Sequence, residues 1–600
     1  MKPLNITYDQ FIHLYSQIPE FKLPESFIES LNQAKNLIDS LPRNIRILIF
    51  TDSNDFDGLG GGAIQFLSLI NLGFNNVSIY GSGDRSTLPG NINDFDLLIT
   101  NDVGININYS SFENPSKFII VTDHHIGQNI QSTNNKIYVC LTNICGAYIS
   151  YLLFSQFENK LSSSIMQTIF EYAAIATISD GMPINTFNKM NIQKLYSIIR
   201  NTINSQSLGP KIESKAFYYL IKDSLKYFDY ATMSFNVIPK LNAPMKLNNK
   251  MNIAGEYYIL NNRSTDDWQL VMTYLLTDDY DIAIRLNNIN EKRKNITTSI
   301  QQEITQILSY NSFINQATEN EQFINNNKYS IKYTKYIIEV DAPVQNHISG
   351  LIASKLSEYY KIPVIVNAKF NSSIRGPDAF KILEIPEIKA NLEHYGGHAE
   401  AAGFKRKDNF ELDLSMYKPK QEEKQEHKQE EIDEDLEKLK DLKNIRISLD
   451  DKLKKDVDNI INWVRSNIPF QFDPVFTKTI QIKKMYVLKG LHTKIIDTDG
   501  YDYMYFFHSD INTKCKIGDK LQVAFKIGNT NSIIEILDIF NQTDKQDEIQ
   551  EDDIILNINY SNVTFGGSNF SENVPTSIKQ SPKPKETQME IHLIDLDDLK

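Results

Sequence analysis

The stretch VTDHHIGQ, residues 121–128, follows the apolar run KFII at 117–120. An apolar run of this kind predicts a short buried strand, and this one ends in Asp123, His124 and His125. Carboxylate oxygens and imidazole nitrogens are common ligands of hard and borderline metal ions. The end of this strand is therefore a candidate metal site.

Two earlier stretches repeat the pattern of a buried strand that ends in aspartate. NIRILIFTD (44–52) and FDLLITND (95–102) are both short and apolar, and a helical pattern, GGGAIQFLSLINLG (60–73), follows the first. Strands that alternate with helices predict a parallel sheet, and open parallel sheets place ligand sites beyond the carboxyl ends of their strands. One aspartate at a strand end is more often a helix cap or a turn residue, but three such strands favour a shared site. The residues expected to converge there are Asp52, Asp55, Asp57, Asp102, Asp123, His124 and His125.

A further aspartate, Asp180, follows the long helical pattern IFEYAAIATISDGMP (169–183), where Gly181 and Pro183 predict the end of the helix. Alone it would be a turn residue, but beside the other carboxylates it is a candidate ligand. Several carboxylates within a few ångströms repel one another unless a cation neutralises them. Oxygen ligands combined with imidazole favour Mn²⁺ or Mg²⁺, and a pair of such ions is a common arrangement for phosphoester hydrolysis.

Four short motifs, NDFDG, TNDVG, TDHH and ATISDGMP, occur in an order and spacing that resemble those of the DHH phosphoesterase superfamily. The resemblance continues towards the C-terminus and is most specific to RecJ-type single-strand exonucleases, which carry a second, DHHA1, domain and an OB-fold. It covers about residues 40–540. The further segments that carry it are NVIPKLNAPMKLNN (236–249), LLTDDYDIAIRLNNINEKRKNI (275–296), SSIRGPDAFKILE (372–384), YGGHAEAAGF (395–404) and IPFQFDPVFTKTIQI (468–482).

The resemblance implies a catalytic site that holds two Mn²⁺ or Mg²⁺ ions. One ligand position differs: bacterial RecJ proteins carry an aspartate two residues before the position of Asp55, where this chain has Ser53. Asp52, one residue further upstream, is a candidate metal ligand in its place, and the sequence leaves that role open. The residues to which the resemblance assigns metal-binding and catalytic roles are Asp55, Asp57, Asp102, His124, His125 and Asp180, and Asp123 completes the catalytic site.

Arg375 and the GGH sequence at Gly396, Gly397 and His398 are the candidates for contact with a substrate phosphate. Glycines let the backbone approach a phosphate closely, a histidine can donate to it, and an arginine can bind it through two hydrogen bonds. The alternative for the glycines is a tight turn into a buried strand of small residues. Two weaker candidates for phosphate contact, which are otherwise ordinary surface cations, are Arg85 and Lys246.

The predicted fold is α/β: a parallel-sheet DHH domain is joined by helices to a smaller α/β DHHA1 domain, and an OB-fold β-barrel follows. A chain of 600 residues is too long for one core. The barrel is expected from short alternating apolar runs between turns, and its aromatic and lysine side chains would suit single-stranded nucleic acid. The predicted boundaries are 1–195 for the DHH domain, 196–325 for a helical connector, 326–412 for the DHHA1 domain, 413–444 for a charged linker, 445–540 for the OB-fold domain and 541–600 for a disordered acidic tail.

The net charge of −13 at pH 7 is unusual for a nucleic-acid-binding protein until it is mapped along the chain. Residues 422–441 hold ten acidic residues against four lysines, and residues 541–600 hold twelve against five lysines. These two segments account for the whole net charge, so a local basic groove elsewhere is compatible with it. The acidic linker either tethers the barrel flexibly or mimics nucleic acid. The tail is either an unstructured end or a peptide that binds a protein partner.

Three cysteines cannot build a disulfide framework, and no apolar stretch approaches the roughly 20 residues that a membrane span needs. We therefore expect a cytoplasmic protein that does not enter a membrane, and we expect a monomer.

The combined expectation is a metal-dependent single-stranded-DNA exonuclease that releases nucleotides in DNA repair and recombination. Its 5′ to 3′ polarity is implied by the resemblance alone, and RNA stays open as a further substrate. One alternative is a hydrolase of short oligonucleotides or cyclic dinucleotides, which the chain length and the OB-like segment disfavour. Another is a non-catalytic replication scaffold of the same fold, which the intact ligand motifs disfavour.

Overall fold

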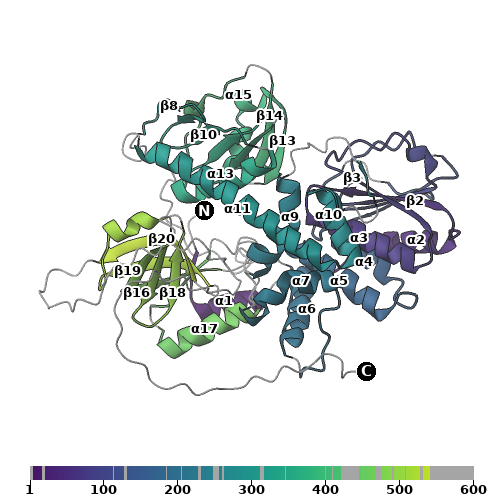
Figure 1. The fold of residues 1–600 in the computed structure, drawn as a ribbon, viewed down its shortest axis with the longest axis horizontal. Coiled ribbons are helices and arrows are strands. Elements are labelled where there is room, and N and C mark those ends of the chain that lie inside the picture. Colours follow the sequence, from purple (N-terminus) through teal and green to yellow (C-terminus); the bar gives the residue numbers. More distant parts are fainter. Residues whose placement is uncertain are drawn as a thin grey trace, which may run out of the picture. The chain divides into compact units, whose positions relative to one another are not determined.

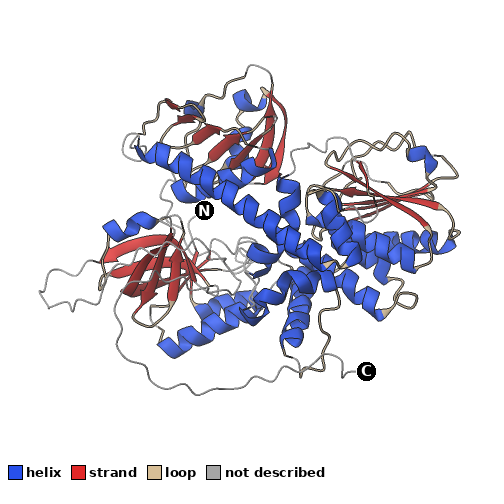
Figure 2. Ribbon diagram, in the orientation of Figure 1, coloured by secondary structure: helices blue, strands red, loops and turns tan. Residues whose placement is uncertain are grey.

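The computed structural model places three β-sheets, each accompanied by helices (Figures 1 and 2). The predicted tail, and the predicted linker beyond residue 419, lie outside the described residues. The structure describes residues 4–16, 21–112, 114–127, 131–183, 185–204, 206–227, 232–247, 256–259, 263–310, 317–344, 346–369, 371–398, 400–407, 410–419, 445–450, 452–467, 474–488, 492–506, 508–527 and 531–540.

The first sheet has six strands in the order β6-β5-β4-β2-β3-β7. Its first five strands are parallel, and only β7 runs antiparallel to its neighbour. The strands β2, β4 and β5 are almost wholly buried, which matches the continuous apolar runs in their sequences. The predicted parallel α/β sheet is thus confirmed. The strand bounds are β2 Arg46–Asp52, β3 Asn76–Ser82, β4 Leu97–Asn101, β5 Phe118–Asp123, β6 Lys136–Cys140 and β7 Glu256–Tyr257.

Helices pack against this sheet and share one apolar core with it. The helix α3 follows β2 directly and packs against α4, α5 and α10, so the predicted strand and helix order is also confirmed. The helix bounds are α2 Glu25–Ser40, α3 Phe56–Asn71, α4 Gly146–Ser155, α5 Ser163–Ser179, α6 Thr186–Ile203, α7 Lys215–Ile221, α9 Ile238–Leu247 and α10 Trp268–Thr277, with short 3₁₀ or π turns at Ile92–Asp94, Lys222–Tyr227 and Met233–Val237.

The long helix α11, Tyr280–Tyr310, contributes to two cores. Its first half places Leu286 in the core of the first sheet, and its second half places Ile304 and Leu308 in the core of the second. Because one uninterrupted helix belongs to both cores, it joins the two α/β units. The predicted connector bounds of 196–325 stay a prediction.

The second sheet has seven strands in the order β13-β14-β12-β11-β10-β9-β8. Only β10 and β11 pair in parallel, and α13 connects these two strands. This is the smaller α/β unit that the sequence predicts. The bounds are β8 Gln322–Asn325, β9 Ser330–Tyr333, β10 Ile338–Asp341, α13 Asn346–Tyr360, β11 Val364–Asn367, β12 Ser372–Arg375, α14 Ala379–Leu383, α15 Pro386–Lys389, β13 Leu392–His398, β14 Ala401–Arg406 and a 3₁₀ turn at Leu414–Met416.

The third sheet contains a closed ring of strands, because β16 pairs both with β17 and with β19. The ring runs β16-β17-β18-β20-β19 and returns to β16, with β18 and β20 in parallel. This order is consistent with the predicted five-stranded OB-fold barrel. The bounds are β15 Ile445–Ser448, α17 Lys454–Asn467, β16 Val475–Leu488, β17 His492–Asp497, β18 Asp502–Tyr505, β19 Lys520–Lys526 and β20 Asn531–Phe540, with a 3₁₀ turn at Ser509–Thr513.

The N-terminal segment joins this third sheet and not the first. The strand β1, Leu4–Ile6, pairs in parallel with β15, and Phe11 of α1, Tyr8–Ser16, is fully buried in the core of the third sheet. This differs from the predicted boundary, which placed residues 1–195 together in the first domain. The amphipathic pattern of α1 shows that the helix needs a core, but it carries no information about which core it joins.

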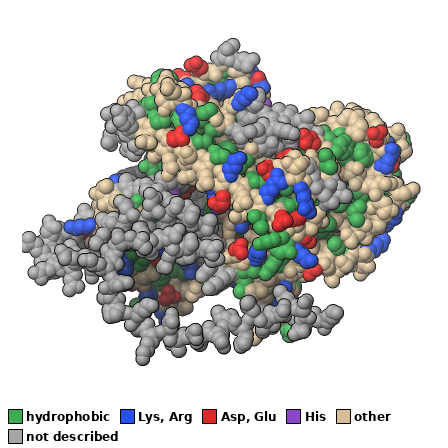
Figure 3. Space-filling model, in the orientation of Figure 1, with side chains coloured by type: hydrophobic (Ala, Val, Ile, Leu, Met, Phe, Trp, Pro, Cys, Tyr) green, Lys and Arg blue, Asp and Glu red, His purple; other side chains and the backbone are tan. Residues whose placement is uncertain are grey.

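Basic and acidic side chains are interspersed on the face of the molecule seen in Figure 3. No described helix is long and apolar enough to cross a membrane.

We predict that Phe11→Ala destabilises the third sheet although the residue is more than 400 positions away in sequence from β15. Removal of a fully buried phenylalanine side chain costs about 3–5 kcal/mol. Hydrogen–deuterium exchange should therefore accelerate in β16 and β19, while β2 and β4 keep their protection. Leu453→Ala, which removes an exposed apolar side chain close to α17, is the control. Unchanged protection of β16 and β19 in Phe11→Ala would contradict the shared core.

Candidate metal centre

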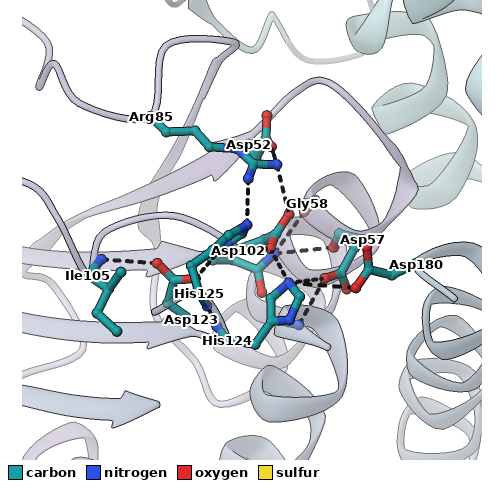
Figure 4. A network of polar contacts seen from close by, with 12 residues as sticks. Asp52, Asp57, Gly58, Arg85, Asp102, Ile105, Asp123, His124, His125 and Asp180 are labelled. Atoms are coloured by element: carbon teal, nitrogen blue, oxygen red, sulfur yellow. Dashed lines mark hydrogen bonds and ion pairs between the residues drawn. The ribbon is translucent and has the colours of Figure 1, made fainter. Parts of the chain in front are cut away.

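The register of the first sheet brings the ends of its central strands to one edge. Thr51 of β2 lies beside Asn101 of β4, and Asn101 lies beside Thr122 of β5. Asp52, Asp102 and Asp123, the next residues along each strand, therefore meet at the carboxyl edge of the sheet (Figure 4). The predicted convergence of these three strand ends is observed.

Asp102 has a left-handed backbone conformation, with φ of 56°. Aspartate and asparagine tolerate this conformation better than most residues. Its backbone N–H donates to the Thr122 carbonyl oxygen at 3.0 Å, so the turn out of β4 is held by the neighbouring strand. The turn directs the Asp102 side chain into the cluster (Figure 4).

Asp57 lies at the start of α3 and is held by the N-terminus of α4. Its two carboxylate oxygens accept the backbone N–H groups of Gly146 and Ala147 at 2.9 and 2.8 Å. A helix N-terminus interacts favourably with a carboxylate, so α4 fixes the position of this side chain. The start of α4 also packs closely against Asp102, because a Cβ added to Gly146 would lie 2.9 Å from the Cα of Asp102.

Three carboxylates surround one imidazole nitrogen. His124 Nε2 lies 3.1 Å from Asp102 Oδ1, 3.6 Å from Asp180 Oδ2 and 3.7 Å from Asp57 Oδ2. Donor atoms at about 2.1 Å from one Mn²⁺ or Mg²⁺ ion lie roughly 3 Å apart. These four side chains, which we call the ligand set, therefore have the chemistry of a divalent-cation site. The possible ligand atoms that lie within 4.8 Å of one another form two groups that share His124: Asp57, His124 and Asp180, and Asp102, His124 and His125.

The electrostatics of the ligand set also fit a cation. Burial, and then the nearby Asp57, raise the pKa of Asp102 well above its ordinary value. Burial, followed by Asp57 and Asp55, raises the pKa of Asp180 to about 8. Asp102 Oδ1 is buried and accepts no hydrogen bond from any described residue. A divalent cation would neutralise these carboxylates and supply the missing partner.

Asp123 holds the loop that follows β5. Its Oδ1 accepts the backbone N–H groups of His124 and His125 at 2.7 and 3.1 Å and lies 2.7 Å from His125 Nδ1. Its Oδ2 accepts the Ile105 N–H at 3.0 Å. Burial acts to raise the pKa of Asp123, but these contacts outweigh it and hold the pKa below its ordinary value. Asp123 thus orients both histidines and is engaged on both of its oxygens.

Asp52 and Asp55 do not belong to the ligand set, and each has a different partner. Asp52 is fully buried, and its Oδ2 accepts from Arg85 Nε at 2.7 Å. Asp55 caps the N-terminus of α3, where it accepts the Asp57 N–H at 3.1 Å. Neither belongs to the groups of possible metal ligands found among the described residues. Their metal-binding roles stay predictions.

The residues predicted to contact substrate phosphate belong mainly to the second sheet. Arg375 of β12 lies beside Ala401 of β14, and Gly397 of β13 lies beside Ala402. A Cβ on Gly397, which has φ of 146°, would meet the Ala401 carbonyl oxygen at 2.3 Å. The GGH sequence therefore ends β13, which pairs antiparallel with β14, and Gly403 of β14 is exposed, so β14 is not the buried strand of the alternative interpretation. The side chain of His398 is outside the described part of the chain.

Arg375 is half-buried, and burial lowers the pKa of its guanidinium. Its Nη1 donates to the carbonyl oxygens of Ile374 and Ala402 at 2.8 and 2.9 Å, and a Cβ added to Gly350 of α13 would lie 2.6 Å from Nη2. Lys246 lies in the last turn of α9, half-buried. The phosphate contacts of both residues stay predictions.

The sequence interpretation missed the N–H groups of Gly146 and Ala147 that hold Asp57. A signal was present in the sequence, because the apolar run GAYISYLLFS begins at Gly146, shortly after β6 ends at Cys140. What the run does not reveal is which carboxylate its first turn faces.

No protein-family model and no curated protein sequence matches the chain. Among solved structures, RecJ of Thermus thermophilus in complex with Mn²⁺ is 18% identical with a TM-score of 0.57, and the match covers 90% of this chain and 74% of that one. The Mg²⁺ complex of the same protein matches with 18% identity and a TM-score of 0.51 over 86% and 70% of the two chains. A further exonuclease RecJ structure, bound to manganese, is 22% identical with a TM-score of 0.46 over 63% and 90%. The chain thus has the fold of the Thermus thermophilus RecJ structures.

We predict that Asp102→Asn stabilises the metal-free protein and abolishes its stabilisation by Mn²⁺. Asparagine tolerates the left-handed backbone of this position and removes a buried negative charge. The wild type should gain about 2.7 kcal/mol at a Mn²⁺ concentration of about 100 Kd. Thermal unfolding with and without Mn²⁺ measures both effects.

Asp94→Asn removes an exposed carboxylate of the same unit and is the matched control, which should behave as the wild type. A Mn²⁺-dependent rise of Tm that persists in Asp102→Asn would argue against the ligand set.

Proposed function

We propose that this chain is a Mn²⁺- or Mg²⁺-dependent exonuclease that hydrolyses single-stranded DNA. The observation that carries the proposal is the ligand set, in which three carboxylates lie within 3.7 Å of one His124 nitrogen. A divalent cation at such a site activates water and stabilises the negative charge that develops on a phosphate.

Two exposed side chains lie beside the ligand set. The side chain of His125 is 35% exposed and that of Arg85 is 41% exposed, whereas those of Asp52 and Asp102 are almost wholly buried. Both nitrogens of the His125 ring already face a partner, Asp123 Oδ1 at Nδ1 and Arg85 Nη1 at Nε2. The exposure of Arg85 supports its predicted contact with a substrate phosphate, because a guanidinium can donate several hydrogen bonds. The contact of His125 with the scissile phosphate stays a prediction.

Residues of the second sheet are candidates for binding the terminal phosphate of a DNA strand. Arg375 of β12 and the backbone at Gly396 and Gly397 of β13 lie on the two strands that flank β14. A guanidinium and exposed glycine backbone are suited to a terminal phosphate. A site that binds the terminal phosphate would select the end of a DNA strand, and cleavage would then be exonucleolytic. The 5′ to 3′ direction and a role in DNA repair and recombination rest on the sequence resemblance.

The barrel offers part of a platform for single-stranded nucleic acid. Lys483 and Lys484 of β16 are exposed, and the rings of Tyr505 and His508 stack with centroids 4.0 Å apart. Exposed cations and half-exposed aromatic rings are the elements of sequence-independent single-strand binding. Tyr503, by contrast, is buried in the core.

The decisive experiment is a time course on oligonucleotides labelled at the 5′ or the 3′ end. Single strands and duplexes are compared in Mn²⁺, in Mg²⁺ and in chelator. We expect metal-dependent release of mononucleotides from the 5′ end of single strands. Cleavage confined to di- to tetranucleotides would replace the proposal with a small-oligonucleotide hydrolase. Binding without hydrolysis would replace it with a non-catalytic scaffold.

We predict that Asp102→Asn lowers hydrolysis of single strands by at least about 1,000-fold, because a ligand of the cation is lost. Asp94→Asn should retain the wild-type rate. Circular dichroism and thermal unfolding establish that both variants are folded. A rate within a few fold of the wild type in Asp102→Asn would refute the catalytic assignment.

We predict that Arg375→Ala raises KM for single strands about 10- to 100-fold, with a smaller change in kcat. A charge-assisted contact of about 1.5–3 kcal/mol to a phosphate would be lost. The control is Arg46→Ala, which removes an exposed guanidinium at the start of β2, the end of the strand away from Asp52. An effect confined to kcat would place Arg375 outside substrate binding.

A further inference from the structure

A fully buried asparagine, Asn101, precedes the metal ligand candidate Asp102 in the chain. It is the last residue of β4 and has no exposed surface. Its amide nitrogen donates to the carbonyl oxygens of Asp57 and Gly58 at 3.3 and 3.0 Å. Carbonyl oxygens only accept hydrogen bonds, so they determine that the nitrogen of the amide faces α3 and its oxygen faces away. A side chain of β4 is thus bound to the first turn of α3, the turn that carries Asp57.

The other end of the same amide is bound to α4. The hydroxyl of Ser150 donates to Asn101 Oδ1 at 2.7 Å. Ser150 lies about one turn after the two backbone N–H groups of α4 that hold the Asp57 carboxylate. Asn101 therefore contacts both helices that fix Asp57, and it is covalently joined to Asp102.

Buried polar groups below the strand ends hold the Asn101 amide in its orientation. Gln65 Nε2 donates to Ser150 Oγ at 2.9 Å and to Thr122 Oγ1 at 3.1 Å. The Thr122 hydroxyl donates in turn to the Thr100 carbonyl oxygen at 2.7 Å. Because a hydroxyl has one hydrogen, the bond that Ser150 accepts from Gln65 leaves its hydrogen for Asn101. All five residues of this network are fully buried, where hydrogen bonds strengthen one another.

The glycine-rich start of α3 makes room for this amide. The helix contains three consecutive glycines, residues 60–62, although glycine inside a helix is destabilising relative to alanine. A Cβ added to Gly61 would lie 2.0 Å from Asn101 Oδ1 and 2.2 Å from its Cγ. The Asn101 amide therefore occupies the space that a side chain at this position of α3 would need.

We propose that Asn101 is a positioning residue of the metal centre, whose amide fixes the start of α3, and with it Asp57, relative to Asp102. The inference deepens the proposed nuclease function and rests on it for its catalytic meaning. The contacts that carry it join the amide to backbone carbonyl oxygens and to a buried hydroxyl, and not to a side chain of the ligand set. A metal ion needs its ligand atoms at set distances, so movement of Asp57 away from Asp102 weakens its binding.

The test is the affinity of the full chain for Mn²⁺. Purified protein is stripped with chelator and titrated with MnCl₂ by isothermal titration calorimetry, and thermal unfolding establishes that each variant is folded. Asn101→Leu replaces the amide by an apolar group of the same branching that forms no hydrogen bond. We expect the dissociation constant for Mn²⁺ to rise about 10- to 100-fold, which is the usual loss when a residue that orients a metal ligand is removed. Single-strand hydrolysis at low Mn²⁺ should fall by a similar factor and recover as the Mn²⁺ concentration is raised.

Two further variants separate positioning from a general loss of stability. Asn290→Leu replaces another fully buried asparagine, which lies in α11 and accepts hydrogen bonds from Arg293, and it should keep the wild-type affinity for Mn²⁺. Ser150→Ala removes the hydroxyl that orients the Asn101 amide and should weaken Mn²⁺ binding by a smaller factor than Asn101→Leu does.

An unchanged dissociation constant for Mn²⁺ in folded Asn101→Leu would overturn the inference, and so would an equal rise in Asn290→Leu. If Asn101→Leu does not fold, Ser150→Ala decides in its place. Weaker Mn²⁺ binding in that variant then supports the inference, and wild-type binding overturns it.

The Mn²⁺ affinity also separates this inference from the nuclease proposal. A chain that degrades single strands with the same Mn²⁺ dependence in the wild type and in Asn101→Leu retains the proposed function and loses the inference. A chain whose Mn²⁺ affinity depends on Asn101 but which hydrolyses no nucleic acid retains the assignment of Asn101 and loses the proposed function.

Discussion

The mutual repulsion of buried carboxylates at one sheet edge is the constraint on which the rest of the structure depends. Parallel strands end at the same edge, so the register of β2, β4 and β5 places Asp52, Asp102 and Asp123 there together. Burial makes the charge on Asp102 more costly and leaves its Oδ1 without a hydrogen bond from the described residues. A fold that tolerates this cost must provide positive charge in other forms.

Each acidic group meets a different source of positive charge. The N–H groups at the start of α4 hold Asp57, the guanidinium of Arg85 holds Asp52, and the imidazole and backbone of His125 hold Asp123. What these elements leave without compensation is Asp102 Oδ1 together with Asp180. These are the oxygens that a divalent cation would neutralise.

The sequence predicts the convergence of the acidic residues well, because the local pattern of apolar strand followed by aspartate determines it. It does not predict how each one is compensated. Arg85 follows Asp52 by 33 positions in the chain, and only the pairing of β2 with β3 brings the two together. The same limit applies to Phe11, whose apolar helix requires a core but whose partner strand, β15, lies at the other end of the chain. Long-range pairing is decided by the whole fold and leaves no local signal.

The N-terminal contribution to the third sheet also constrains the barrel. Residues 420–444 join β15 to the second unit and would span roughly 85 Å if fully extended. Residues 17–24, by contrast, join α1 to α2 and reach only about 30 Å. Because Phe11 of α1 is buried in the core of the third sheet, the short connection ties this sheet to the rest of the chain as the long one does. A local sequence pattern in either connection carries no sign of this double attachment.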